Sequence, residues 1–443
     1  MRRLTYVGLR LFSSLQHFLR TRLTGAGWVV LATALTAAAV GIDTSRTMSY
    51  QLFAFLGALL VLAFAAAPFF RPRVSVRRDL PRYATAGEAF EYRVVVENRG
   101  ARALSGASVV EAPRDPRPSY REWIATREPG EERRNWFDRN QGYFRWTWLI
   151  DRRSPHRPGE RALAPLAPGE RAALKLTLKP RRRGRIELAG LVLARNDPLG
   201  LARGLARYAA PGSVIALPRR YRLPAITLPG ARRFQQGGVA LATSVGDSEE
   251  FIGLREYRPG DPLQRVHWKS TARARTPIVK EFQDEFFERH ALILDTSSAR
   301  GEDDAFEEAV AVAASFVYAI DTRECLLDLL FVGGEVRTYT AGRGQLQMEH
   351  MLEVLAGVRP SVPGEFERLS RAVLAQRRAL SSCIAVLLAW DEPRRAFVRA
   401  LAASGLELRV LLVAEPGALA EEPPANVAVL RPGEVEAGLA RLR

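Results

Sequence analysis

Residues 291–298 read Ala-Leu-Ile-Leu-Asp-Thr-Ser-Ser, a short apolar run that ends in a carboxylate and hydroxyls. So short a run is typical of a strand that is buried on both faces. We expect further strands at 326–332, 383–389, 406–413 and 427–430, and helices at 305–320, at 394–403 and from 434 onward. Strands that alternate with helices predict a doubly wound, Rossmann-type α/β domain over residues 283–443.

The polar end of this run is a candidate cation site. Doubly wound sheets bind ligands beyond the carboxyl ends of their strands, where Asp295 and Ser297 are expected to lie. A carboxylate beside hydroxyl groups suits a hard cation such as Mg²⁺. The alternative is that Asp295 only caps a helix.

The N-terminal part of the chain predicts a transmembrane helical hairpin at residues 23–70. Leu23–Ile42 and Thr47–Phe70 contain no charged residue, and only Asp43–Arg46 separates them. Each stretch is long enough for a hydrocarbon core of about 30 Å. Helices buried in a soluble core, or a cleaved signal peptide ending near Ala37 and Ala39, are the alternatives.

Basic residues lie on both sides of this hairpin. Arg71, Arg73, Arg77 and Arg78 follow it, and the leader at residues 1–22 contains Arg2, Arg3, Arg10, Arg20 and Arg22. Positive flanks predict that both termini and the soluble domains are cytoplasmic, with the protein in the inner (cytoplasmic) membrane. The leader also has apolar residues at helical spacing, which predicts an amphipathic helix on the membrane surface.

Residues 74–217 change to a two-residue period. Apolar and charged residues alternate at 90–96 and at 174–178, which predicts half-buried antiparallel strands. With later strands at 186–193 and 214–217 we expect a β-sandwich over 74–217, followed by a linker at 218–250.

Aromatic residues crowd into one arginine-rich stretch of this segment. They are Trp123, Trp136, Tyr143, Phe144, Trp146 and Trp148. Two interpretations stay open: a long hairpin within the sandwich, or a surface that contacts a protein or the membrane.

Composition excludes several classes of function. The 443 residues carry a net charge of +17, but arginine is spread through every segment and mixed with acidic residues, so we expect no nucleic-acid partner. Cys325 and Cys383 are too few for a disulfide framework or a thiolate zinc site, and we expect both to be buried thiols.

Residues 251–273 form the most charged motif, Phe-Ile-Gly-Leu-Arg-Glu-Tyr-Arg-Pro-Gly-Asp-Pro-Leu-Gln-Arg-Val-His-Trp-Lys-Ser-Thr-Ala-Arg. Pro259-Gly260 predicts a turn, and Asp261 and Pro262 suit the start of a short basic helix that extends to Arg273. A short strand is expected at 278–282. The charged signature therefore occupies residues 251–282.

This motif resembles the signature of the bacterial "domain of unknown function 58" family, Phe-x-Gly-Leu-Arg-x-Tyr-x-Pro-Gly-Asp followed by Arg-x-Ile/Val-x-Trp-Lys-x-x-Ala-Arg. The stretch from 183 to 201 is also similar to the family, whereas residues 113–160 fit it least well. The signature residues are Phe251, Gly253, Leu254, Arg255, Tyr257, Pro259, Gly260, Asp261, Arg265, Trp268, Lys269, Ala272 and Arg273.

The resemblance implies a membrane-anchored protein with a von Willebrand factor A-like domain at residues 283–443 and a MoxR-type AAA+ ATPase as partner. In A domains the metal site reads Asp-x-Ser-x-Ser, with a further Asp after a later strand. Asp295 and Ser297 match, Ala299 replaces the last Ser, and Asp391 is the best candidate for the later Asp. Thr338 and Thr340 are merely nearby in the sequence. The resemblance thus implies Mg²⁺ at an incomplete site and no other cofactor.

Enzymatic motifs are missing from the sequence. It has no phosphate-binding loop, no dinucleotide fingerprint and no His-Glu-x-x-His zinc motif, and an Asp295 phosphotransferase would need an acid where Ser297 stands. We therefore expect no catalytic residues and a scaffold or adaptor that docks a protein partner. The alternative is a hydrolase or metal-dependent enzyme that uses His267 and acids of the signature, or Asp295 and Asp391.

Overall fold

The computed structural model of the chain describes residues 2–41, 47–112, 115–128, 130–154, 156–157, 159–224, 235–236, 249–261, 263–274, 276–284, 286–298, 303–320, 325–342, 345–362, 364–415, 419 and 421–442. The chain divides into two compact units, Met1–Leu217 and Pro218–Arg443. Residues 225–234 and 237–248 of the expected linker at 218–250 lie outside the described residues.

Three helices open the first unit: α1 (Arg2–Arg22), α2 (Gly25–Val40) and α3 (Thr47–Ala66). Residues 48–69, which are α3 and the 3₁₀ turn η1 (Ala67–Phe69), form the one stretch among the described residues that is long and apolar enough to cross a membrane. At about 1.5 Å per residue, α2 is shorter than a hydrocarbon core of about 30 Å. One candidate span therefore follows from the structure, where the sequence predicted two.

A polar contact explains why α2 begins later than the apolar run at Leu23. The Thr24 hydroxyl accepts a hydrogen bond from the Gly27 amide and caps the helix. The same hydroxyl donates to the Gly200 carbonyl at 2.6 Å, and Leu23 pairs with Ala202. The start of α2 is thus attached to the turn before β9.

Two sheets form the rest of the first unit. One has the order β1-β3-β7-β5 and the other β2-β9-β8-β4-β6. The strands are β1 (Val74–Asp79), β2 (Tyr83–Thr85), β3 (Phe90–Asn98), β4 (Ala107–Ala112), β5 (His156–Arg157), β6 (Glu160–Ala162), β7 (Arg171–Pro180), β8 (Gly184–Asn196) and β9 (Arg203–Leu217). Alternate residues of both sheets, such as Val94 and Leu191, enter one hydrophobic cluster. The expected strands exist, while the name β-sandwich stays a prediction.

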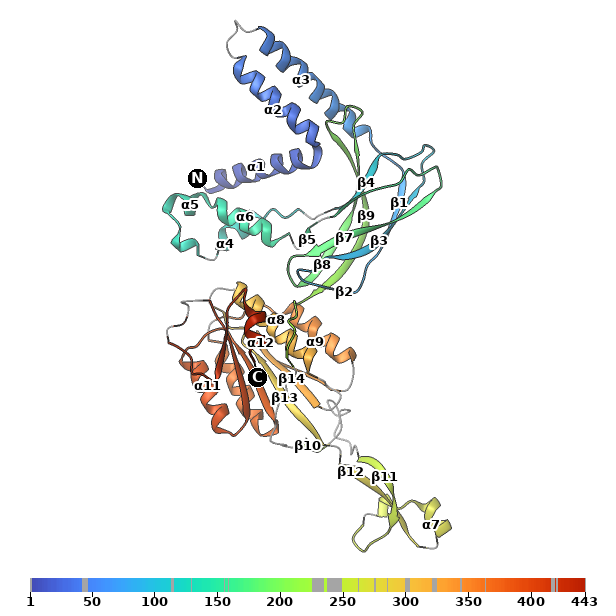
Figure 1. The fold of residues 1–443 in the computed structure, drawn as a ribbon, viewed down its shortest axis with the longest axis vertical. Coiled ribbons are helices and arrows are strands. Elements are labelled where there is room, and N and C mark those ends of the chain that lie inside the picture. The colour runs from blue at the N-terminus through green and yellow to red at the C-terminus, as the bar shows by residue number, and fades with distance from the viewer. Residues whose placement is uncertain are drawn as a thin grey trace. The chain divides into compact units, whose positions relative to one another are not determined.

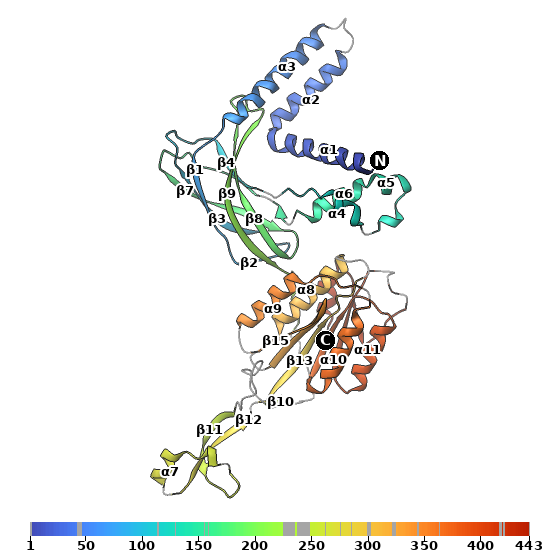
Figure 2. The same ribbon diagram turned by 180° about the vertical axis from the view of Figure 1, so that it is seen from behind.

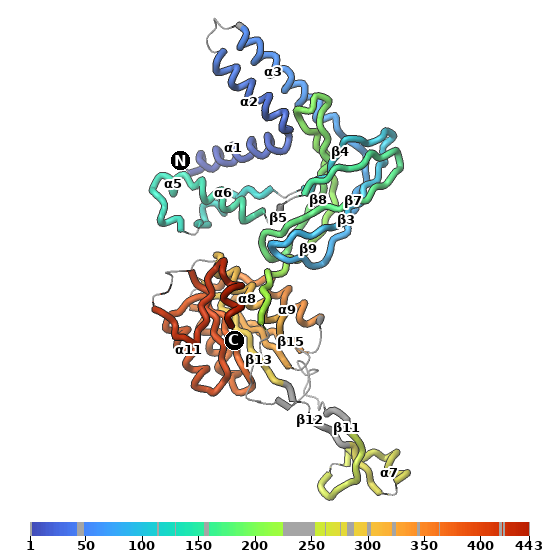
Figure 3. The backbone as a smooth tube through the Cα atoms, viewed as in Figure 1, coloured from blue at the N-terminus to red at the C-terminus, as the bar shows by residue number. Residues whose placement is uncertain are grey.

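Residues 120–152 contradict the interpretation of the aromatic stretch as a long hairpin. They form α4 (Tyr120–Ala125), the 3₁₀ turn η2 (Glu131–Arg133), α5 (Trp136–Gln141) and α6 (Tyr143–Arg152). Ser119 and Asn135 cap α4 and α5 through their side chains, and the left-handed Gly142 separates α5 from α6. Figure 3 traces these helices beside α1.

The second unit is built around a Rossmann-like mixed sheet of order β15-β14-β13-β16-β17-β18 (Figure 1). The strands are β13 (Phe286–Leu294), β14 (Cys325–Gly333), β15 (Glu335–Ala341), β16 (Ser382–Leu387), β17 (Glu407–Val413) and β18 (Val427–Leu430). A short strand β10 (Gln235–Gln236) pairs with β13. All neighbours in the six-strand order are parallel except β14 and β15, so the alternation of strands and helices that predicted a doubly wound sheet does not extend to this edge.

Helices cover both faces of this sheet. In Figures 1 and 2, α8 (Asp304–Ala319) and α9 (Gln345–Gly357) lie on one side, and α10 (Phe366–Gln376) and α11 (Glu392–Ala403) lie on the other. The 3₁₀ turn η5 (Arg377–Ala379) follows α10, and α12 (Val435–Ala440) ends the unit. Cys325 and Cys383 are buried free thiols, as the sequence predicts.

A buried ion pair joins the two sheets of the first unit. Arg78 of β1 donates to Glu111 of β4 at 2.9 Å, and the Tyr92 hydroxyl of β3 donates to the other Glu111 oxygen. Both charged side chains are almost fully buried. Burial raises the pKa of Glu111. If either partner is removed, the other charge stays in the apolar core without compensation.

We therefore expect Glu111→Ala to lower the free energy of unfolding by about 3 kcal/mol or more. Hydrogen–deuterium exchange of peptides from β4 and β8 in the detergent-solubilised protein measures this locally. The control is Glu187→Ala on β8, whose exposed pair with Arg185 at 3.9 Å should contribute less than about 0.5 kcal/mol. Equal exchange in the two variants would contradict the prediction.

Candidate functional site

The strand order places Asp295 at the point where the sheet changes direction. β13 lies between β14 and β16, so the strands that follow it in sequence pair on opposite sides. Asp295 comes directly after β13, and its amide donates to the Val386 carbonyl of β16 at 2.9 Å. The Asp295 side chain is 0% exposed. Its oxygens accept hydrogen bonds from the amides of Ser297 and Leu388, at 2.9 and 3.1 Å.

Arg394 supplies the positive charge beside Asp295. Its Nε donates to Asp295 Oδ2 at 2.6 Å, its Nη1 to Asp391 Oδ2 at 2.5 Å and its Nη2 to the Ser297 carbonyl at 3.0 Å. The guanidinium carbon lies 4.7 Å from the centre of the Phe366 ring. Burial acts to lower the pKa of Arg394, but the carboxylates of Asp295 and Asp391 outweigh it and raise the pKa. The arginine therefore stays charged.

The structure brings the three expected metal ligands together, but around a guanidinium. Asp295 and Asp391 direct carboxylate oxygens at Arg394, and Ser297 contributes its backbone carbonyl. The Ser297 hydroxyl donates to the Val362 carbonyl at 3.2 Å. Asp391 also caps α11. These donors do not fit a divalent cation while Arg394 lies between them, because the arginine already neutralises the carboxylates.

No other metal cluster replaces this one within the part of the chain that the structure describes. There, no three His, Cys, Asp or Glu side chains are grouped closely enough to hold a metal ion. Thr340 donates to Asp328 at 2.6 Å, so this threonine belongs to a different buried pair, in which Arg289 is the cation. Thr338 lies on β15, and Ala299 lies outside the described residues.

A loop from a distant part of the sequence completes the surroundings of Asp295. The Ser361 amide donates to the Thr296 carbonyl at 2.7 Å, and the Thr296 hydroxyl donates to the Val332 carbonyl at 2.8 Å. Ser297 and Ser361 form a parallel bridge. These contacts fix the chain after β13 in an extended form, so Asp295 caps no helix there.

The signature residues are brought together in a separate hairpin. β11 (Glu249–Glu256) pairs antiparallel with β12 (Ile278–Asp284). Gly253, Leu254 and Arg255 lie on β11, as does the backbone of Phe251. Residues 257–261 form the turn, and Arg265 lies in the 3₁₀ turn η4 (Leu263–Arg265). Trp268, Lys269, Ala272 and Arg273 lie on α7 (Trp268–Ala274).

The single basic helix predicted from Pro262 onward is therefore interrupted. Val266 forms a bridge with Val279, and the His267 amide donates to the Ile278 carbonyl at 2.8 Å. Because these backbone groups pair with β12, α7 begins only at Trp268. Pro262 itself lies outside the described residues.

One ion pair fixes the turn of the hairpin. Both Nη atoms of Arg255 donate to the two oxygens of Asp261, each at 2.7 Å, and the Arg258 amide donates to Asp261 at 2.8 Å. Arg255 first, and then the Arg258 amide, lower the pKa of Asp261 to about 2. Because the folded pKa lies below the unfolded value of about 3.9, the pair is fully formed at neutral pH and is lost as the pH falls toward 2.

The hairpin exposes apolar as well as basic side chains. Trp268 and Leu263 are each 69% exposed, beside the exposed Lys269 and Arg273. The His267 Nδ1 atom lies 2.7 Å from the Ser270 hydroxyl. That contact spans three residues within one turn, which is typical of local capping, and the partner that orients the imidazole is a hydroxyl rather than a carboxylate.

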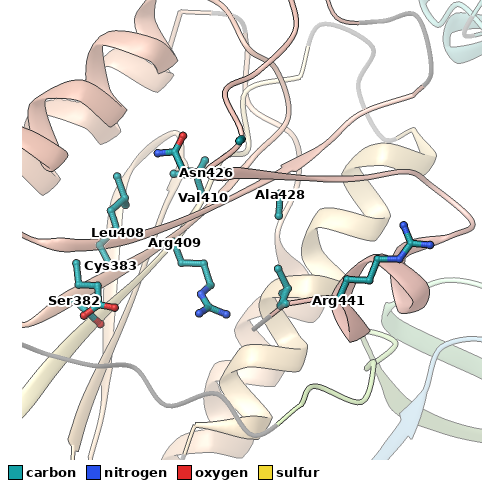
Figure 4. A pocket seen from close by; sticks show the side chains of 11 residues that line it. Ser382, Cys383, Leu408, Arg409, Val410, Asn426, Ala428 and Arg441 are labelled. Atoms are coloured by element: carbon teal, nitrogen blue, oxygen red, sulfur yellow. The ribbon is translucent and has the colours of Figure 1, made fainter.

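A pocket of about 370 Å³ lies at the other end of the sheet (Figure 4). Its wall includes Ser382 and Glu407, the first residues of β16 and β17, together with Arg409 and Arg441. Ligands of doubly wound sheets bind at the carboxyl ends of the strands. This pocket is at the amino ends, so it does not mark the expected site.

Residues 253–416 match the family described as "Protein of unknown function DUF58". The match includes most of the signature hairpin, Asp295 and Arg394. A curated relative, "Uncharacterized protein YeaD" of Bacillus subtilis (strain 168), is 26% identical over 182 residues, which is 41% of this chain. The aligned region spans 44% of that relative's length, which is less than half.

Solved structures resemble the chain only remotely. The CARDB domain of PF1109 from Pyrococcus furiosus, crystallised in complex with di-metal ions, is 13% identical, with 32% of this chain and 89% of that chain covered and a TM-score of 0.16. The PapD-like domain 7 of human CEP192 is 12% identical, with 32% and 84% covered and the same TM-score. Scores this low carry no argument about fold or ligand.

Sequence reasoning missed Arg394 and Ser361. A signal for Arg394 exists, because it is the third residue after Asp391 and both lie in the first turn of a helix that follows a strand. Ser361 gives no such signal, because only the long-range bridge to Ser297 brings it to the site.

Removing Arg394 should leave the Asp295 carboxylate buried without compensation. We expect Arg394→Ala to destabilise the second unit by about 3 to 5 kcal/mol, measured by hydrogen exchange of peptides from β13 and β16. Arg395→Ala is the matched control, because Arg395 pairs with the more exposed Glu392 and Glu421 and should cost about 1 kcal/mol or less. Similar exchange rates for the two variants would refute the role of Arg394.

Mg²⁺ should not stabilise the wild-type site. Because Arg394 neutralises Asp295, we expect the unfolding temperature of the second unit to be the same in millimolar Mg²⁺ and in EDTA. Limited proteolysis at increasing temperature measures this unfolding temperature. Arg394→Ala serves as the variant in which the carboxylates lose their arginine. Mg²⁺-dependent stabilisation of the wild type would show that the cation displaces the guanidinium.

Proposed function

We propose that this chain is a non-enzymatic, membrane-anchored scaffold whose cytoplasmic unit docks a protein partner, and that this partner is a MoxR-type AAA+ ATPase. The partner would supply the energy that the chain itself has no means to generate. The observation that carries the proposal is that Trp268 is exposed on a hairpin whose backbone is held by an ion pair and a strand bridge.

The hairpin has the properties of a docking element. The Arg255–Asp261 pair and the bridge between Val266 and Val279 hold the backbone, so little order must be gained on binding. Tryptophan and arginine are enriched among the residues that dominate binding energy. The partner surface would present an apolar pocket for the indole and acidic groups for Lys269 and Arg273.

The carboxyl ends of β13 and β16 offer a second docking surface. In the proposed A-like domain this edge would bind a partner without a metal, since Arg394 already compensates Asp295. Val362 is exposed and Asp391 is half exposed there. Asp295 is unsuitable as a test residue, because its loss would leave Arg394 buried and unpaired.

The membrane assignment is also a proposal. We infer two spans, α2 and α3, with both termini and both units cytoplasmic, because arginines flank the hairpin on both sides. The proposed β-sandwich would then lie next to the membrane. The shorter α2 is accommodated by a locally thinner bilayer at a modest cost.

Affinity purification of the full-length protein from detergent-solubilised membranes, followed by mass spectrometry, tests the docking. We expect wild type to recover an AAA+ ATPase, and Trp268→Ala to lower the recovery at least tenfold, which corresponds to about 1.4 kcal/mol of lost binding energy. Leu346→Ala on α9 is the control, because that apolar side chain is also exposed in the second unit.

The outcomes separate the two surfaces and the enzyme alternative. Loss of the ATPase with Val362→Asp but not with Trp268→Ala would move the contact to the carboxyl edge of the sheet. If no ATPase is recovered with any variant, the adaptor proposal fails. The enzyme alternative would then be tested by measuring whether turnover depends on His267 or Asp391.

A further inference from the structure

Helix α1 exposes a continuous apolar stripe. Its members are Leu4, Val7, Leu11, Phe12, Leu15 and Phe18. They recur every three or four residues and therefore share one side of the helix. Leu4 is 77% exposed and Leu11 is 66% exposed. Apolar surface of this extent marks a site of interaction.

The other side of α1 is held by the helical segment at residues 115–154. The buried Tyr6 ring lies 5.3 Å from the ring of Tyr120, 5.9 Å from that of Trp123 and 5.5 Å from that of Trp146, all measured between centroids. The Tyr6 hydroxyl donates to the Pro118 carbonyl at 3.1 Å. These contacts fix the rotation of α1 about its axis.

Two polar contacts support the same arrangement. The guanidinium of Arg117 donates to the Ser14 hydroxyl, and the Arg3 guanidinium carbon lies 5.7 Å from the centre of the Tyr120 ring. At about 3.6 residues per turn, Tyr6 and Leu11 point in nearly opposite directions. The segment therefore clamps α1 by the side that carries Tyr6 and leaves the stripe from Leu4 to Leu15 exposed.

The C-terminal end of α1 contacts the candidate membrane span, α3. The Phe18 ring stacks on the Phe64 ring of α3 at 5.8 Å, and the chain passes from Arg22 to α2 with only Leu23 and Thr24 between them. Figures 1 and 2 show α1 at the end of the α2–α3 pair where α2 begins. Helices α4 to α6 lie on the side of α1 that faces away from this pair.

The charge of α1 identifies the chemistry of its partner. The helix has five arginines and no acidic residue. Basic amphipathic helices bind the surface of anionic membranes, because apolar burial and attraction to the headgroups act together. The neighbouring α5 exposes Trp136 at 71%, and tryptophan is enriched at the membrane interface.

We propose that α1 lies in the headgroup layer of an anionic bilayer with its apolar stripe toward the acyl chains, and that the segment at residues 115–154 is the clamp that sets this orientation. The inference assigns a role to the aromatic stretch and concerns lipid, so it does not depend on the docking of an ATPase. It rests on the proposed membrane anchoring only in that α3 crosses the same bilayer.

A fluorescent probe on α1 tests the orientation in the full-length protein. Because Cys325 and Cys383 are buried, a new surface cysteine is labelled selectively with an NBD fluorophore. The positions are Leu11→Cys on the stripe and Gln16→Cys outside it, in vesicles of phosphatidylcholine and phosphatidylglycerol. We expect a blue-shifted emission and quenching by spin-labelled lipids at position 11, and neither at position 16.

The outcomes separate this inference from the anchoring. A protein that alkaline carbonate extracts from the vesicles would refute the proposed span. A protein that stays integrated but leaves position 11 water-exposed would refute the lipid contact. A blue shift at position 11 without quenching by spin-labelled lipids would show that protein covers the stripe, which would also overturn the inference.

Variants of the clamp test its role. Tyr6→Ala should remove the contrast between positions 11 and 16, because α1 is then free to rotate. Arg117→Ala is the milder variant and should reduce the contrast, whereas Arg121→Ala, an exposed arginine on α4, should leave it unchanged. An undiminished contrast in both Tyr6→Ala and Arg117→Ala would refute the clamp.

Discussion

The buried pair of Asp295 and Arg394 constrains the carboxyl edge of the second unit. A carboxylate with no exposed surface cannot stay ionised without compensation. Here two amides and a guanidinium provide it, and the same guanidinium reaches Asp391 and the Ser297 carbonyl. One side chain from α11 thereby ties the ends of β13 and β16 together. A metal would have to break this set of contacts before it could bind.

A few polar contacts also hold the first unit together. Arg78, Glu111 and Tyr92 join the two sheets through one buried carboxylate, while Thr24 attaches the start of α2 to the turn at Gly200. Gly27 makes this close approach possible, since a Cβ there would lie 2.1 Å from the Leu201 carbonyl oxygen. The turn that ends at Leu201 therefore positions the start of α2.

Local pattern predicted those elements whose burial is uniform. The expected strand at 383–389 overlaps β16, whose residues are all buried, and the expected helix at 305–320 matches the largely buried α8 within one residue at each end. The edge strand β15 escaped prediction, because its exposed residues show no apolar run. The prediction for the aromatic stretch failed for another reason. The rings of Trp123 and Trp146 pack with Tyr6 of α1, and caps such as Ser119, rather than periodicity, define the short helices of this stretch.

The candidate site shows more clearly what the sequence could not predict. Asp295 and Ser297 were predicted from their place at the end of a strand and Asp391 from the resemblance to A domains, and the fold does bring them together. Their spacing could not reveal which cation they surround, because a guanidinium from the third residue of the next helix satisfies the same oxygens as a metal would. In a site built from carboxylates, the identity of the counter-charge is a property of the packed structure. A partner that bound this edge would meet a carboxylate that Arg394 already neutralises, so shape and exposed groups such as Val362 and Asp391 would have to supply the recognition.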